Sequence, residues 1–175
     1  TITGSSGYDI HTRSLANALD KIIPIRLTTN IYSGQEQILT DRELQMIKRK
    51  PQKDEINLII TIPNQWRLHT TNQRNWAYCI WEGSKVPDSW IDEFLNPDIE
   101  YILVASNHTK QAIINTVEDI SEKDEVIDKI KIIPHGVDLN LFYSKDKPTD
   151  RLVFIANKGW RNLEDRGGIQ YLIKA

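Results

Sequence analysis

The stretch Ile56-Asn57-Leu58-Ile59-Ile60-Thr61-Ile62 has the clearest strand pattern in the chain. Five of its seven residues are isoleucine or leucine, so both faces of such a strand would be apolar. A strand that is apolar on both faces is typical of a parallel sheet covered by helices. We therefore predict that residues 56–62 form a central parallel strand.

On both sides of this strand, short apolar runs alternate with helical patterns, which indicates a parallel α/β sheet. Thr40 and Glu43 have the spacing of a capping box at a helix start, and Ser106 is a good cap for a helix that follows it. We expect strands at residues 24–28, 56–62, 76–81, 101–105 and 130–133, helices at 11–21, 40–50, 87–95 and 109–117, and an acidic connection at 118–129. These elements predict a Rossmann-like parallel sheet with helices on both faces.

The composition changes after residue 142, where a polar, proline-containing segment is typical of a linker between domains. A new strand pattern and the start of a helix follow it. We therefore predict an amino-terminal domain over residues 1–142, a linker over 143–150, and the start of a second Rossmann-like domain over 151–175. One strand and one helix bury too little apolar surface to be stable alone. We expect residues 152–155 to dock on a neighbour, such as a second copy of the chain in a homo-oligomer.

The chain has 175 residues, of which 39% are apolar and 26% charged, as in an ordinary globular protein. Its net charge of −2 and its scattered lysines and arginines argue against a nucleic-acid partner. No apolar run reaches the roughly 20 residues of a membrane span, and we find no secretory signal. The single cysteine, Cys79, lies in an apolar run, which favours a buried and inert thiol. We therefore expect a cytoplasmic protein, either free or peripheral at a membrane.

A second informative stretch is Ile130-Lys131-Ile132-Ile133-Pro134-His135-Gly136-Val137-Asp138. A short apolar strand ends at a proline, which cannot donate to a sheet ladder. The glycine that follows lets the backbone pass close to another surface, and Asp138 is a good cap for a short turn. Since open α/β sheets bind ligands at the carboxyl ends of their strands, His135, Gly136 and Asp138 are candidate site residues.

The turn Gly4-Ser5-Ser6-Gly7 leads into a helix start, where free backbone N–H groups favour an anion. With Thr3 and Tyr8 it resembles the cofactor loop of NAD(P)-dependent nucleotide-sugar epimerases and reductases. Ile10 stands where the third glycine of that loop should be, and no acidic residue follows strand 24–28 to bind a ribose. Tyr143 and Lys147 have the spacing of that family's catalytic pair but lie in the linker. A non-catalytic Rossmann-like binding domain, in which the turn only packs a helix, is a further alternative.

The motifs, taken in their order along the chain, resemble the group 1 (family 4) retaining glycosyltransferases. Pro134-His135-Gly136-Val137-Asp138 is similar to the family's Pro-x-Gly-apolar-Asp motif, and Gly7-Tyr8 to its amino-terminal glycine loop. Ile80-Trp81-Glu82 resembles an aromatic-Glu strand end, with Glu82 where other members carry a histidine that lines the cleft. Ser106-Asn107-His108-Thr109 matches a Ser-x-x-(Ser/Thr) segment. Members have two Rossmann-like domains in a type B fold and use nucleotide sugars as donors.

The resemblance implies a fold, an activity and a set of site residues. The chain would be the acceptor-side domain and the first βα unit of the donor domain of a hexosyltransferase. It would transfer a sugar, with retention, from a nucleotide-sugar donor to a carbohydrate, lipid or protein acceptor, with no cofactor besides the donor. Catalytic roles are implied for Glu82 and His135, and contacts with the donor or its phosphates for Gly4, Gly7, Tyr8, Gly136, Asp138, Lys158, Arg161 and Arg166.

The chain departs from the family pattern in its last part. Gly167 replaces the lysine of the family's Arg-Lys-Gly turn, and Asn157 stands near the arginine position. The family's Glu-x₇-Glu pair would lie beyond Ala175, so we expect the chain alone to bind a donor weakly and not to turn over. There is no Asp-x-Asp, and the four histidines lack ligand spacing, so we expect no metal. Backbone N–H groups and cations would then stabilise the leaving diphosphate.

Overall fold

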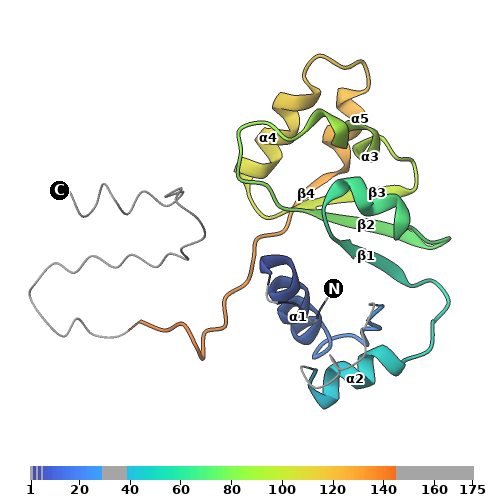
Figure 1. The fold of residues 1–175 in the computed structure, drawn as a ribbon, viewed down its shortest axis with the longest axis vertical. Helices are drawn as coiled ribbons and strands as arrows, with labels where there is room; N and C mark the ends of the chain where they lie inside the picture. Colours follow the sequence, from blue (N-terminus) through green and yellow to red (C-terminus); the bar gives the residue numbers. More distant parts are fainter. Residues whose placement is uncertain (1, 3, 5, 29–38, 145–175) are drawn as a thin grey trace, which may run out of the picture. The chain divides into compact units, whose positions relative to one another are not determined.

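The computed structural model describes residues 2, 4, 6–28 and 39–144 (Figure 1). The chain divides into two compact units, Thr1–Gly136 and Val137–Ala175, and each is described by itself. The first unit contains, in chain order, α1 (Gly7–Leu19), α2 (Asp41–Lys48), β1 (Ile56–Ile60), η2 (Pro63–Leu68), β2 (Arg74–Cys79), η3 (Asp88–Trp90), α3 (Ile91–Phe94), β3 (Ile99–Val104), α4 (Asn107–Val117), α5 (Lys123–Lys129) and β4 (Ile130–Ile132).

The second unit is described for residues 137–144. There the Phe142 N–H donates to the Asp138 carbonyl at 2.8 Å, which closes a short turn. The predicted linker from residue 145 onward and the predicted strand and helix at 151–175 lie outside the described residues. The domain boundary at residue 142 stays a prediction.

The first unit is built on a four-stranded parallel sheet in the order β1-β2-β3-β4. Successive strands are therefore neighbours, joined by η2, by η3 with α3, and by α4 with α5. Right-handed crossovers that advance in one direction place their helices on one face of the sheet, as Figure 1 shows. The predicted α/β class with a parallel sheet is confirmed.

The face covered by these helices holds the apolar core. Ala77 and Cys79 on β2, and Ile102 and Val104 on β3, point toward it because side chains alternate along a strand. The helices contribute Trp66, Trp90, Phe94, Ala112, Ile113, Val117 and Val126. Cys79 is buried, as predicted, and burial raises the pKa of its thiol to about 12. The thiol is therefore protonated at neutral pH.

Helix α1 lies against the opposite face of the sheet. Tyr78 follows Ala77 on β2 and so points away from the core, and its ring centre lies 4.8 Å from that of His11. Helix α2 is fastened to α1 through the buried Glu43, which accepts from Asn17 Nδ2 at 2.8 Å and from Arg13 Nε at 3.3 Å. Helices on both faces of the sheet were predicted and are present.

Two helices begin at the caps identified in the sequence. The Thr40 hydroxyl accepts from the Glu43 N–H, and the Glu43 carboxylate accepts from the Thr40 N–H at 2.8 Å, which is the reciprocal pair of a capping box. The Ser106 hydroxyl accepts from the Thr109 N–H at 3.2 Å. The predicted caps of α2 and α4 are therefore confirmed, although α4 begins at Asn107 and not at residue 109.

Two predictions about secondary structure are wrong. Residues 24–28 form no strand, because their backbone groups bond to the end of α2: the Leu27 N–H donates to the Met46 carbonyl at 3.2 Å, and Arg49 Nη1 donates to the Ile25 carbonyl at 2.6 Å. The connection predicted at residues 118–129 contains α5. Its charges pair along the helix, with Lys129 Nζ 2.9 Å from Glu125 Oε1.

The prediction that residues 56–62 form a central strand is also wrong, because β1 is the edge strand of the described sheet. It ends at Ile60, and Pro63 begins η2. Ile59 is the one buried residue of β1, whereas Ile56 is 43% exposed. An apolar composition predicts a strand, but it does not determine the position of that strand in the sheet.

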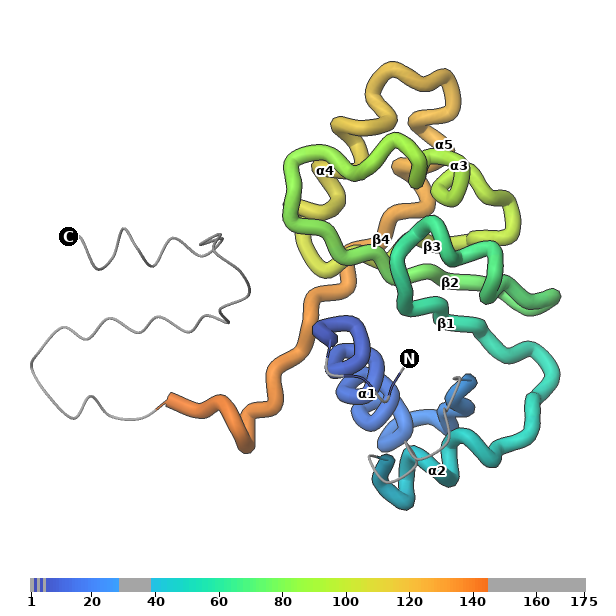
Figure 2. The backbone as a smooth tube through the Cα atoms, in the orientation of Figure 1, coloured from blue at the N-terminus to red at the C-terminus, as the bar shows by residue number. Residues whose placement is uncertain are grey.

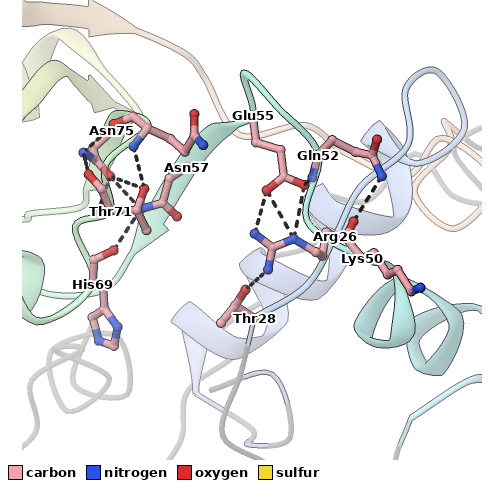
Figure 3. Close-up of polar contacts among 10 residues, drawn as sticks. Arg26, Thr28, Lys50, Gln52, Glu55, Asn57, His69, Thr71 and Asn75 are labelled. Carbon is pink, nitrogen blue, oxygen red and sulfur yellow. Dashed lines mark hydrogen bonds and ion pairs between the residues drawn. The ribbon is translucent and has the colours of Figure 1, made fainter.

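Hydrogen bonds between polar side chains and the backbone hold the amino-terminal ends of β1 and β2 in place (Figure 3). The buried Asn75 side chain accepts from Asn57 Nδ2 at 2.8 Å and from the Thr71 N–H at 2.9 Å, and it donates to the Asp98 carbonyl at 3.1 Å. The Asn75 side chain thus forms these hydrogen bonds with other residues of the protein. A hollow of about 510 Å³ opens beside Asn75, but it lies at the end of the strands opposite to the predicted site.

Candidate functional site

The amino-terminal turn of α1 reaches the carboxyl end of β2. The Tyr8 hydroxyl donates to the Ile80 carbonyl at 3.4 Å, across 72 positions of sequence. Burial is the main cause that raises the pKa of Tyr8 to about 12, and the negative charge of Glu82 raises it further. Tyr8 therefore stays protonated at neutral pH and is a hydrogen-bond donor at this edge of the sheet.

Three rings, here called the ring cluster, meet beside Tyr8: those of His11, Tyr78 and His135. The centre of the His11 ring lies 4.3 Å from that of His135, and the rings of Tyr78 and His135 are stacked at 5.8 Å. The Tyr78 hydroxyl donates to the Ile133 carbonyl at 2.6 Å, which holds the segment leading to His135. The ring cluster thus joins α1 to the carboxyl ends of β2 and β4.

The environment of His11 disfavours a charge. Burial, and then the neighbouring His135, lower the pKa of His11 below its ordinary value. The His11 Nε2 atom is buried and has no hydrogen-bond partner among the described residues. A buried nitrogen that makes no hydrogen bond does not hold the side chain in place, so His11 is held by its ring contacts with Tyr78 and His135.

Glu82 lies three residues after the end of β2, in an exposed position. It is near enough to Tyr8 for its charge to raise the pKa of the tyrosine. Its backbone carbonyl is bonded to His108 of α4 at 3.0 Å. Glu82 and Tyr8 were predicted as site residues, and the structure brings them together at one end of β2.

The amino terminus of α1 is closed by its own side chains. Asp9 is 6% exposed and accepts from the Ser6 N–H at 3.1 Å and from the Ser6 hydroxyl, while the Asp9 N–H donates to Ser6 Oγ at 3.2 Å. A Cβ atom on Gly4 would overlap the Asp9 carboxylate, so glycine is required there. A phosphate at this helix end would have to approach a buried carboxylate, which is unfavourable.

The other predicted site residues are placed as follows. Gly7, the first residue of α1, is exposed, and a Cβ atom added to it would contact no other residue within 4 Å. A Cβ atom added to Gly136 would likewise meet open space. Asp138 belongs to the second unit, where its carboxylate accepts from the Asn140 N–H at 2.9 Å. Lys158, Arg161 and Arg166 lie outside the described residues. A role for these residues in a common site stays a prediction.

Sequence reasoning missed His11 and Tyr78 as members of the site. His11 lies one helical turn after Gly7-Tyr8, so it shares the side of α1 that carries Tyr8. Tyr78 alternates with the buried Ala77 and Cys79 and must therefore face away from the core. The periodicities could have indicated both orientations, but the contact with His135 depends on the pairing of β2, β3 and β4.

Comparison with protein-family models, with curated proteins and with solved structures finds no match. None of the helices in the described part of the chain is both long and apolar enough to cross a bilayer. Within residues 2, 4, 6–28 and 39–144, no three His, Cys, Asp or Glu side chains gather as a metal site would require.

Proposed function

We propose that this chain is the amino-terminal, acceptor-side part of a retaining group 1 glycosyltransferase that uses a nucleotide-sugar donor. The acceptor would be a carbohydrate, a lipid or a protein, and transfer would need no metal or other cofactor. Glu82 and His135 would contact the reacting sugars. Lys158, Arg161 and Arg166 would neutralise the donor diphosphate, as the resemblance implies. We place the protein in the cytoplasm, where an unpaired cysteine such as Cys79 stays reduced.

One observation carries this proposal: the glycine loop and the aromatic-Glu strand end meet in space. Tyr8 follows the glycine loop and bonds to Ile80, which begins the aromatic-Glu motif. His135 of the third motif reaches the same end of β2, because its ring stacks on Tyr78. Three segments that resemble one family's motifs thus converge at the carboxyl ends of parallel strands, where ligands of open α/β sheets bind.

The chemistry of this edge suits neutral, hydroxyl-rich ligands. The Tyr8 hydroxyl donates to Ile80 and can still accept a hydrogen bond, and Glu82 is an exposed carboxylate. Hydroxyl groups of a sugar can pair with each of these groups. In this proposal the glycine loop lies beside the sugar, and the cations of the second domain carry most of the diphosphate charge.

The alternative of an NAD(P)-dependent epimerase or reductase is less well supported. It would bring a pyrophosphate to the amino terminus of α1. The Asp9 carboxylate already accepts hydrogen bonds from Ser6 at that position and would repel the phosphates. This observation favours the glycosyltransferase proposal over the dinucleotide alternative.

Saturation-transfer NMR on the 175-residue chain can test the proposal, with UDP-glucose, UDP-N-acetylglucosamine, GDP-mannose and NAD⁺ as probes. We expect weak binding of at least one nucleotide sugar and none of NAD⁺. Glu82→Gln should weaken that binding about tenfold, since a hydrogen bond to a charged group contributes about 1.5–3 kcal/mol. Glu118→Gln, the same exchange at an exposed glutamate after α4, is the matched control and should leave binding unchanged.

Three results would overturn the proposal. Binding of NAD⁺ without any nucleotide sugar would support the epimerase or reductase alternative. Binding of none of the four probes would support a non-catalytic domain. Binding of a nucleotide sugar that Glu82→Gln and Glu118→Gln leave equally strong would remove the site at the end of β2.

A further inference from the structure

The loop of residues 81–86, here called the Glu82 loop, is bonded along its length to one helix. The Thr109 hydroxyl donates to the Trp81 carbonyl at 3.1 Å, and His108 Nε2 lies 3.0 Å from the Glu82 carbonyl oxygen. Further along, Asn115 Nδ2 donates to the Ser84 carbonyl at 3.0 Å. In Figure 2 the green segment after β2 runs beside α4, as these bonds require.

The end of the Glu82 loop is closed in the same way. The Val86 N–H donates to the Thr116 hydroxyl at 2.9 Å, and Trp81 Nε1 donates to the Lys85 carbonyl at 2.6 Å. A Cβ atom on Gly83 would lie 2.8 Å from Trp81 Nε1, so the loop leaves room only for glycine at that position. Side chains thus bond to five of the six loop residues, which is unusual for an exposed connection.

The side chains that α4 supplies form two pairs, two helical turns apart. His108 and Thr109 lie in the first turn, and Asn115 and Thr116 follow seven residues later on the same side of the helix. Ala112, Ile113 and Val117 of the same helix are buried in the core. The helix is therefore fixed to the sheet by one side and presents a polar row to the Glu82 loop by another.

We propose that this row of α4 positions Glu82, and that His108 is the positioning residue closest to it. The proposal rests on the proposed function only for the role of Glu82, since the order of the loop can be measured without a ligand. His108 is exposed, so it adds little burial, but its bond ends on the carbonyl of Glu82 itself. A carbonyl can only accept, so Nε2 carries the proton. The bond holds the peptide that follows Glu82 and thereby limits the positions that its side chain can reach.

The first test measures the backbone order of the loop by ¹⁵N relaxation in the 175-residue chain. We expect the order parameters of the Glu82 and Gly83 amides to fall from about 0.85 toward 0.6 in His108→Ala. His108→Gln, whose amide nitrogen can donate to the same carbonyl, should restore much of the order. Lys110→Ala is the control, because this side chain has no hydrogen bond to the loop among the described contacts.

The second measurement separates this inference from the proposed function. With whichever of UDP-glucose, UDP-N-acetylglucosamine and GDP-mannose binds, His108→Ala should weaken binding about threefold to tenfold, and His108→Gln should restore it. If Glu82→Gln leaves binding unchanged while His108→Ala loosens the loop, the proposed function fails and the positioning role stands. If His108→Ala leaves the order parameters as Lys110→Ala does, the positioning role is overturned, whatever the ligand result.

Discussion

The two faces of the sheet are built from different kinds of contact. The face under η2, α3, α4 and α5 is packed with apolar side chains, among them Trp66 and Phe94, which are 0% exposed. On the opposite face the half-buried Trp76 and Tyr101 have cations beside them. The Arg74 guanidinium lies 5.7 Å from the Trp76 ring centre, and Lys131 Nζ lies 5.2 Å from that of Tyr101.

This difference implies that the residues that stabilise the fold are mostly distinct from the residues of the candidate site. Closely packed apolar side chains supply most of the free energy of folding, and here most of the buried ones lie on one face. The ring cluster lies at the end of the other face, where its contacts are polar or between rings. Substitutions on the first face should therefore lower the free energy of unfolding, whereas substitutions at the site should mainly change binding.

The largest expected effect tests this separation directly. Phe94→Ala removes a fully buried ring that lies 5.8 Å from the ring of Trp66, and it should cost about 3–5 kcal/mol in the free energy of unfolding. Trp76→Ala, a larger truncation on the opposite face, should cost about 1 kcal/mol. Urea unfolding followed by circular dichroism measures both. Equal losses would show that the two faces contribute equally and would break the comparison.

The second prediction concerns Glu43, which joins α2 to α1 on the polar side. Its carboxylate is 2% exposed and accepts from Asn17 Nδ2 and from the Thr40 N–H, both at 2.8 Å. Glu43→Ala should cost about 2 kcal/mol, because hydrogen bonds to a charged group are lost. Glu118→Ala, at an exposed glutamate, is the control and should cost less than about 0.5 kcal/mol.

The pH dependence of the Glu43 contribution gives a sharper check. Burial raises the pKa of Glu43, but hydrogen bonds from Thr40 and Asn17 together with the charge of Arg13 outweigh it, and the pKa lies below its ordinary value of 4.5. A depressed carboxyl pKa stabilises the fold above the unfolded pKa, and this stabilisation is lost as the pH falls through the folded one. The difference in stability between the wild type and Glu43→Gln should thus shrink below about pH 4.5. A constant difference would mean that the carboxylate charge is unimportant.

Local signals in the sequence predicted much of this fold, because they act over a few residues. The capping bonds between Thr40 and Glu43 and between Ser106 and Thr109 each lie within one turn of helix. The spacing of these residues in the sequence was therefore sufficient to predict both caps. The failures involve longer distances. Residues 24–28 have a strand composition, but the carbonyl of Met46 takes the N–H of Leu27. No pattern within those five residues indicates this partner.

Only part of the candidate site could be predicted from the sequence. Glu82 and His135 follow predicted strands, and the carboxyl ends of parallel strands lie at one edge, so their approach to that edge followed from the topology. The contacts among His11, Tyr78 and His135 did not, because they depend on strand order and on how α1 lies on the sheet. The bonds from α4 to the Glu82 loop likewise need the packing of α4.

The third prediction compares two glycines at the start of α1. Gly4→Ala would place a methyl group against the Asp9 carboxylate, which Ser6 holds in place, and it should cost about 1–2 kcal/mol. Gly7→Ala meets open space and sits in a helix, where alanine is favoured, so stability should stay equal or rise by up to about 0.5 kcal/mol. Thermal unfolding of the two variants distinguishes these outcomes. A larger loss in Gly7→Ala than in Gly4→Ala would show that the capping box does not hold this turn.

The smallest expected effect is the response of the ring cluster to acid. Burial and the nearby His135 lower the pKa of His11 from its ordinary value of 6.5. Below pH 6.5 the unfolded chain therefore binds a proton that the folded His11 resists, so the free energy of unfolding falls as the pH decreases, until His11 is also protonated in the folded state. His11→Phe keeps a ring against Tyr78 and His135 but cannot titrate, so it should reduce this loss of stability. His69→Phe, at an exposed histidine, should leave the loss as it is in the wild type. Urea unfolding at pH 7.5, 6.5 and 5.5 measures the slopes, and a wild-type slope in His11→Phe would mean that the ring cluster does not sense the pH and is held by ring packing alone.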